Sequence, residues 1–285
     1  MNLKFKKAIR RVALSFTILL IIGFVLSLLL STFALKTTDY TVENPKIGEN
    51  IRIVVLSDLH SSRFGKDNKR LLEKVKKQNP DLIFTVGDML NNNTIDFSYL
   101  STLYKSLGEI APVYCTFGNH ETSHPDTKKI HEIISEHAVL LRNDCREITV
   151  KGCEIRIGGL EDYHPSRTEL DDFLKDFADT HKFTLLLCHC PEHYTWGADN
   201  VKTDLMVSGH THGGQIIIPF KGGFFAPEQG YFPHFDYGVF HEENSTLVIS
   251  KGLGTSDKPI PRFNNIPEIL SLTLSPEVNY EQHTP

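Results

Sequence analysis

Five short apolar runs in this sequence each end on, or just before, a residue that can bind a metal ion. Each run has the length and composition of a buried strand. The runs cover residues 51–56, 81–86, 112–117, 183–188 and 204–207. The residues that follow them are Asp58, His60, Asp88, Asn119, His189, His210 and His212. In open α/β sheets the ligand site lies off the carboxyl ends of the strands, so these side chains are predicted to converge.

The last of these strand ends, residues 208–215, has the most specific pattern. It places His210 and His212 one residue apart between glycines, and glycine permits backbone angles and close approaches that a side chain forbids. Neutral imidazole is the commonest nitrogen ligand for Zn, Mn and Fe. Taken alone, the motif could be two surface histidines in a glycine loop. Its occurrence beside the other strand ends favours a metal site.

The strands alternate with segments of helical periodicity, which predicts βαβ units and an α/β fold. The helical segments are residues 67–78, 97–109, 130–137 and 170–177. A second sheet is predicted from short strands that follow the first motifs. These strands are residues 139–141, 147–150, 154–157, 239–240, 247–250 and 269–274.

Charge is distributed unevenly along the chain. The first 36 residues contain six bases and no acid, whereas the remainder has 24 bases against 35 acids. Nucleic-acid binding depends on basic patches that neutralise phosphates, so the acidic body argues against it. The five cysteines lack a paired zinc-finger spacing. Cys188 and Cys190 could ligate metal, but in a strand they would face away from His189.

Residues 12–35 contain no charged side chain and would form a helix about 36 Å long, enough to span a bilayer. The basic cluster before this run predicts a cytoplasmic N-terminus and an extracytoplasmic body. We therefore expect residues 1–36 to be a basic N-terminus and a single-pass anchor in the cell membrane. Residues 37–50 would be a polar linker, and 51–285 one domain. A signal peptide cleaved near Thr32–Ala34 and twin-arginine export through Arg10-Arg11 remain open alternatives.

The motifs Asp-x-His, Gly-Asp, Gly-Asn-His-Glu, His and Gly-His-Thr-His occur in the order typical of one family. On these residues the chain resembles the calcineurin-like metallophosphoesterase superfamily from Arg52 to about Leu274. The Gly-Gly-Gln tail of the histidine motif, with residues 252–256 and 267–269, is similar to the membrane-associated bacterial branch of YkuE- and YaeI-like phosphoesterases. The resemblance implies a four-layer α-β-β-α sandwich of two mixed sheets flanked by helices.

The resemblance also implies residue roles and two divalent ions, with Mn, Zn or Fe equally compatible with these ligands. Asp88 would bridge the ions, and His120 would stabilise the transition state or protonate the leaving group. One ion would bind Asp58, His60 and His212, and the other Asn119, His189 and His210. Asn91 departs from the family, because many members carry an acid at that position. Two such ions can clamp a phosphoryl group and a bridging hydroxide for in-line attack.

The expected activity is hydrolysis of a phosphoester, with a lipid-linked or cell-envelope phosphodiester favoured by the membrane anchor. A phosphomonoesterase or a soluble-nucleotide phosphodiesterase is an alternative. A metal-bound scaffold or sensor without turnover is an alternative of another class. The aromatic loop of residues 220–235 could be a small core or an apolar lip that admits a lipid chain.

Overall fold

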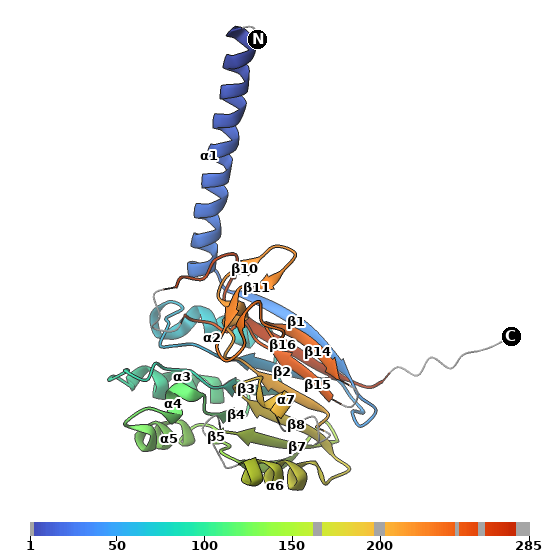
Figure 1. The fold of residues 1–285 in the computed structure, drawn as a ribbon. Helices are drawn as coiled ribbons and strands as arrows, with labels where there is room; N and C mark the ends of the chain where they lie inside the picture. Colours follow the sequence, from blue (N-terminus) through green and yellow to red (C-terminus); the bar gives the residue numbers. More distant parts are fainter. Residues whose placement is uncertain (1–2, 162–166, 197–202, 243–244, 256–259, 278–285) are drawn as a thin grey trace, which may run out of the picture.

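The computed structural model describes residues 3–161, 167–196, 203–242, 245–255 and 260–277. In this part of the chain two six-stranded sheets pack face to face with helices on their outer faces (Figure 1). The strand orders are β1-β16-β2-β3-β4-β5 in the first sheet and β14-β15-β9-β8-β7-β6 in the second. The predicted four-layer sandwich of two mixed sheets is therefore confirmed.

The first sheet has a parallel centre, β2 to β5, extended by the strand from the C-terminal part of the chain. Its strands are β1 (Lys36–Glu43), β16 (Glu268–Ser275), β2 (Ile51–Leu56), β3 (Leu82–Val86), β4 (Val113–Thr116) and β5 (Val139–Leu140). Its helices are η1 (Lys66–Asn68), α2 (Lys69–Lys77), α3 (Ser98–Gly108), α4 (Asn119–Thr122) and α5 (Thr127–Ser135). The helices predicted at 67–78, 97–109 and 130–137 correspond to α2, α3 and α5.

The second sheet is parallel from β15 to β7 and has an antiparallel strand at each edge. Its strands are β14 (Gly238–Glu242), β15 (Ser245–Ile249), β9 (Leu205–Ser208), β8 (Phe183–Cys188), β7 (Cys153–Leu160) and β6 (Asp144–Val150). The associated helices are α6 (Arg167–Ala178), α7 (His193–Trp196) and η3 (His212–Gly214). Two small hairpins follow η3, namely β10 (Ile217–Ile218) with β11 (Gly222–Gly223) and β12 (Phe225–Ala226) with β13 (Gly230–Tyr231).

Two strands predicted for the second sheet belong to the first. β5 pairs with β4, and β16 lies between β1 and β2. The prediction was wrong because the apolar pattern of a strand shows that one of its faces is buried. The pattern does not show which sheet the strand joins. The C-terminal strand pairs with β1 and β2, which are far from it in sequence.

The prediction that residues 37–50 form a linker was also wrong for the first half of this range, which is part of strand β1. β1 pairs in parallel with β16 along its whole length and forms the edge of the first sheet. Alternate residues Thr38, Tyr40 and Val42 turn inward, with Val42 buried. An edge strand exposes many polar side chains, so its composition is similar to that of a linker.

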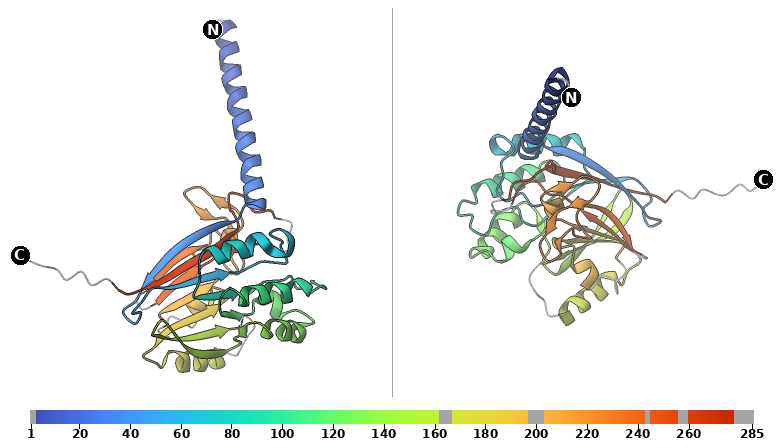
Figure 2. Two further views of the ribbon diagram at one scale, coloured as in Figure 1. Left: turned by 180° about the vertical axis from the view of Figure 1, so that it is seen from behind. Right: turned by 45° about the horizontal axis from the view of Figure 1, so that its top comes forward.

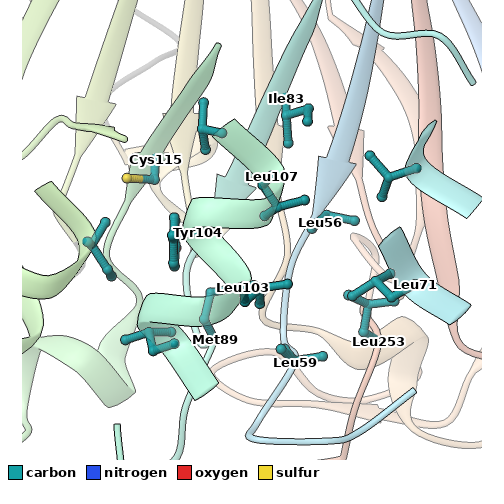
Figure 3. Close-up of a cluster of buried hydrophobic side chains, with 14 of the residues drawn as sticks. Leu56, Leu59, Leu71, Ile83, Met89, Leu103, Tyr104, Leu107, Cys115 and Leu253 are labelled. Carbon is teal, nitrogen blue, oxygen red and sulfur yellow. The ribbon is translucent and has the colours of Figure 1, made fainter. Parts of the chain in front are cut away.

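Three apolar layers hold the sandwich together. The first lies between the outer face of the first sheet and helices α2, α3 and α5, where Leu71, Leu103 and Leu107 pack on Leu56 and Ile83 (Figure 3). A second layer fills the space between the two sheets, and a third lies under α6. These layers fix the strand ends that carry the predicted ligands.

α1 (Leu3–Phe33) projects from this body (Figure 2). It covers residues 12–33 of the predicted apolar segment of residues 12–35 and extends it toward the N-terminus. Within the described residues it is the one helix whose length and composition would allow it to cross a membrane. Its apolar stretch is not buried by the rest of the protein.

Candidate metal centre

The predicted ligands meet at one edge of the sandwich. Asp58 and His60 follow β2, Asp88 follows β3, and His189 and His210 follow β8 and β9. Because these strands are parallel within their sheets, their carboxyl ends lie together. Asn119 and His120, at the start of α4, follow β4 into the same region.

The turns that carry these residues have unusual backbone conformations. Non-glycine residues rarely adopt positive φ, and several of them do so here. They are Asp58 (φ 50°), His60 (47°), Asp88 (54°), His210 (68°) and His212 (50°). Strained residues of this kind cluster at functional sites, where the surrounding structure enforces them. Gly87 lies among them at φ 71°, and a Cβ atom there would stand 2.6 Å from both Gly118 N and His189 Nδ1.

Asp58, His60 and His212 form the first group. One ligand atom from each lies within 4.8 Å of the others. His60 Nε2 is 3.1 Å from His212 Nε2, and His212 Nε2 is 3.7 Å from Asp58 Oδ1. All three residues are buried. Two ring nitrogens and a carboxylate oxygen therefore face one small space.

Asp88, His189 and His210 form the second group by the same distance criterion. His189 Nε2 lies 3.2 Å from Asp88 Oδ2, and the His189 and His210 rings make an edge contact with centroids 5.1 Å apart. Cys190, Glu192 and His210 form a further group by this criterion. No motif in the sequence predicted Glu192 at this position.

Asp88 stands between the two groups. Its Oδ2 atom is 3.2 Å from His189 Nε2, 3.7 Å from His60 Nε2 and 3.9 Å from His120 Nε2. Its Oδ1 atom accepts the backbone N–H of His120 at 2.9 Å. Asp58 Oδ1 also lies 3.9 Å from His189 Nε2, but Asp88 Oδ2 makes the closer approaches to the ring nitrogens of the two groups.

Outer hydrogen bonds set which ring nitrogens carry protons. Asn91 Oδ1 and the Val86 carbonyl can only accept, so His60 Nδ1 and His189 Nδ1 donate to them, each at 2.8 Å. Their Nε2 atoms keep lone pairs that face the centre. Glu228 Oε2 lies 2.7 Å from His210 Nε2, which places the proton on Nε2 and the lone pair on Nδ1. Such outer partners orient metal-binding histidines.

Charge in the centre follows from burial. Burial lowers the pKa of His60, and it lowers that of His212 further, with His60 and Arg262 adding to the effect. Burial alone would raise the pKa of Asp88, but His189, then His60 and His120, hold it well below its usual range. Burial therefore favours neutral His60 and His212 beside ionised Asp88, and neutral imidazole with an ionised carboxylate is the protonation state that binds metal cations.

Two buried oxygens support a fit to metal. Among the described residues, Asp58 Oδ2 and Asn119 Oδ1 have no hydrogen-bond partner. Leaving a buried polar atom unsatisfied is costly, so such atoms call for an explanation. Two divalent ions, one in each ligand group, would satisfy these oxygens, and a set of carboxylate, amide and imidazole ligands suits Mn, Fe or Zn.

His120 lies at the open side of the centre. Its side chain is partly exposed, and Asn92 N–H donates to its Nδ1 at 3.0 Å, which leaves the proton on Nε2. A cavity of about 180 Å³ lies over Asp88, Asn119 and His120. Its outer wall is formed by Phe225, Pro227, Glu228 and Ile260.

Several residues that build the centre were not predicted. Glu121 is buried, and its carboxylate accepts backbone N–H groups of Asp88, Met89 and Gly118 at 2.6–3.0 Å. Burial, with Asp88 next, raises the pKa of Glu121 to about 7. Its place in the Gly-Asn-His-Glu motif was the available signal. Glu228 and Arg262 come from loops without a motif.

The segment 252–254 is hydrogen-bonded to the loop that carries Asp58. Gly254 N–H donates to the Asp58 carbonyl at 2.6 Å, and Leu253 N–H donates to the Ser57 carbonyl at 3.0 Å. Arg262 is buried beside it, with one amino group 3.3 Å from His212 Nδ1. The segment that contains Gly252 and Gly254 is therefore packed against the loop that carries Asp58, and Arg262 contacts His212 beside it.

The predicted aromatic loop divides into two parts. Phe235 is buried against Tyr194 and Phe240, whereas Phe225 is 38% exposed at the cavity wall. The small-core interpretation therefore holds for Phe235, and an apolar wall at the cavity is formed by Phe225.

Comparison with known proteins agrees with this geometry. The model of the family described as "Calcineurin-like phosphoesterase" matches residues 51–214. The chain is 27% identical to the uncharacterized metallophosphoesterase YkuE of Bacillus subtilis, covering 84% of this chain and 85% of YkuE. It is 31% identical to phosphodiesterase YaeI of Escherichia coli, covering 78% and 82%.

Among solved structures, a dimetal phosphatase from Danio rerio is similar with a TM-score of 0.43 and 10% identity, covering 71% of this chain and 87% of that one. The family match spans more than half of the chain and includes every predicted ligand. From the convergent strand ends, the grouped ligands and this match we conclude that the chain belongs to the calcineurin-like phosphoesterase family.

Proposed function

We propose that this protein is a two-metal phosphodiesterase, anchored in the cell membrane by α1, that hydrolyses a lipid-linked or cell-envelope phosphoester. The observation that carries the proposal is the position of Asp88 between two groups of ligands. Asp58, His60 and His212 would hold one ion, and Asn119, His189 and His210 the other. Asp88 would contact both.

Two divalent ions at such a centre supply positive charge that polarises a phosphoryl group and activates water. The chain's own residues supply the rest. His120 keeps a proton on Nε2 at the cavity, where it can donate a hydrogen bond to a phosphoryl or leaving-group oxygen as negative charge develops there. Asn92 fixes this tautomer through its backbone N–H, and Glu121 holds the two loops that carry Asp88 and His120.

The membrane part of the proposal rests on α1 and on the cavity wall. α1 contains an apolar stretch long enough to span a bilayer, and the bases in its first turns favour a cytoplasmic N-terminus. Phe225, Pro227 and Ile260 form an apolar wall beside the predicted catalytic residues. Such a wall suits a substrate with an apolar substituent better than a small soluble phosphate.

The test is hydrolysis by the full-length protein in nanodiscs after metal removal and reloading with Mn, Zn or Fe. We expect turnover of a chromogenic phosphodiester and of a lipid phosphodiester in the same bilayer. The His120→Ala variant is the matched control, because it should keep the metals and lose most of the rate. Absence of turnover on both substrates with every metal would contradict the proposed activity.

A further inference from the structure

We propose that this protein has a membrane-binding surface outside the metal centre. It consists of the β10–β11 hairpin, the segment 260–267 and α2, and its partner is an anionic lipid bilayer. The inference rests on the proposed insertion of α1 but not on the chemistry at the centre. We call these three elements the docking surface.

The docking surface is held to the end of α1 by specific contacts. β1 begins at Lys36, directly after α1 ends at Phe33, so no flexible tether separates them. Ser27 Oγ accepts the backbone N–H of Asn264 at 3.0 Å, and Ser31 Oγ accepts that of Asn265 at 3.1 Å. The orientation of the body relative to the helix is therefore fixed by hydrogen bonds.

These contacts also set the depth of the segment 260–267. Crossing the hydrocarbon takes about 20 residues of helix, which from Val12 reaches Ser31. The Phe263 ring lies 5.0 Å from the ring of Phe24, two turns before that limit. Phe263 therefore lies beside the outer part of the membrane-spanning stretch.

The β10–β11 hairpin is attached to this segment. Ile217 N–H donates to the Phe263 carbonyl, and the Asn264 side chain donates to the Ile217 carbonyl, both at 3.0 Å. The hairpin rises beside the lower end of α1 in both Figure 1 and Figure 2. Phe220 at its tip is fully exposed within the structure. Aromatic side chains are favoured at the headgroup level of a bilayer, which accounts for an exposed ring at this position.

α2 adds positive charge on the same side of the molecule. Residues 66–77 contain six bases, Lys66, Lys69, Arg70, Lys74, Lys76 and Lys77, and two acids, Asp67 and Glu73. α2 lies just below the lower end of α1 (Figure 1), and Arg70 donates to the Phe33 carbonyl at 3.0 Å. The chain beyond residue 36 is acidic as a whole, so this basic helix reverses the local charge. Basic segments at a membrane surface attract anionic lipids.

The docking surface continues into the metal centre. Ile260, at one end of the segment 260–267, is 47% exposed and lines the cavity over Asp88 and His120. Its carbonyl accepts the side-chain amide of Gln215, three residues after His212. A lipid substrate could thus reach the cavity along the surface that contacts the bilayer.

Fluorescence quenching tests the proposal without any need for activity. Trp196 is the only tryptophan, so Trp196→Phe gives a background into which one reporter at a time is placed. The reporters are Phe16→Trp in α1, Phe220→Trp at the hairpin tip and Val139→Trp on β5, the far edge strand of the first sheet. The full-length protein is placed in nanodiscs whose acyl chains carry bromine.

We expect strong quenching of the Phe16→Trp and Phe220→Trp reporters and little quenching of the Val139→Trp reporter. If the Phe220→Trp reporter is quenched no more than the Val139→Trp reporter while the Phe16→Trp reporter is quenched, the anchor stands and the docking surface is refuted. If the Phe16→Trp reporter is not quenched, α1 is not embedded and both ideas fail.

Charge reversal tests the contribution of α2. Lys69→Glu with Lys76→Glu should reduce quenching of the Phe220→Trp reporter in anionic nanodiscs and leave it unchanged in zwitterionic ones. Lys128→Glu on α5 is the control, because Lys128 is exposed and outside the docking surface. Equal effects of the α2 and α5 reversals would refute the preference for anionic lipid.

Discussion

Asp88 is the residue whose position matters most for the proposed centre. Its Oδ2 atom lies within 3.7 Å of a ring nitrogen in each ligand group, and His189 lowers its pKa. We predict that Asp88→Asn lowers activity more than the about 10- to 100-fold loss typical of an outer partner of a metal ligand. Elemental analysis should show fewer than two metals per chain.

His212→Ala is the comparison for this variant, because His212 belongs to one group only. It should cost less activity than Asp88→Asn. If Asp88→Asn keeps two metals and a rate near that of the native protein, the bridging role is wrong.

His120 should separate metal binding from chemistry. One ring nitrogen of His120 lies within 4.8 Å of ligand atoms of His60 and Asp88, but Asn92 N–H donates to its Nδ1, so Nε2 carries a proton and offers no lone pair to a metal. We predict that His120→Ala keeps the full metal content and lowers turnover by about 10²–10³-fold, as expected for a donor that stabilises charge in the transition state. Loss of one metal, measured by elemental analysis, would instead make His120 a ligand.

Asn91 stands where many relatives carry an acid, and the structure shows what it contacts. Its Oδ1 accepts from His60 Nδ1 at 2.8 Å. We predict that Asn91→Asp keeps metal affinity because a carboxylate can accept the same proton. Asn91→Leu should lower it by about 10- to 100-fold because His60 loses its orientation.

Titration of metal-free protein with Mn or Zn, followed by calorimetry, measures the Asn91 effect. Equal affinities for the aspartate and leucine variants would show that the His60–Asn91 hydrogen bond has no influence on the centre.

At the scale of elements, the edge strand β1 decides where the folded body begins. It covers one side of β16 and buries Val42. We predict that a variant beginning at residue 36 folds, whereas one beginning at residue 44 is less stable by several kcal/mol, at about 1 kcal/mol per lost hydrogen bond. Thermal unfolding of the two variants side by side checks this.

One result of the thermal unfolding would contradict the role of β1 in stability. If the shorter variant unfolds at the same temperature as the longer one, β1 would contribute nothing to the stability of the sheet, and residues 37–50 would act as the linker that their composition indicates.

For the whole molecule, the position of Phe225 between the centre and the docking surface predicts selectivity for membrane substrates. Phe225→Ser should lower hydrolysis of a lipid phosphodiester in nanodiscs and spare a small chromogenic phosphodiester, because only the lipid needs the apolar wall. Phe224 packs on Tyr231 and Phe232 and is therefore a poorer site for this test.

Phe235→Ser is the matched control for Phe225→Ser, since Phe235 is buried away from the cavity wall and its loss should affect stability. Equal effects of Phe225→Ser on the lipid and the small substrate would remove support for the lipid assignment.

The sequence by itself was enough to identify the family and the fold class and to predict a set of ligands. Each of these depends on local patterns, such as an apolar run followed by Asp58, or the glycines around His210 and His212. Because parallel strands place their carboxyl ends together, the order of the motifs was enough to predict their convergence.

Only the tertiary structure decided how β1 and β16 pair, which outer partners orient the histidines, and where α2 and Phe220 lie relative to α1. Glu228 reaches His210 from a loop 18 residues away, and Asn265 contacts Ser31 across more than 200 residues. Such contacts depend on how distant segments pack, and a polar strand such as β1 has the same local composition whether it lies in a sheet or in a linker.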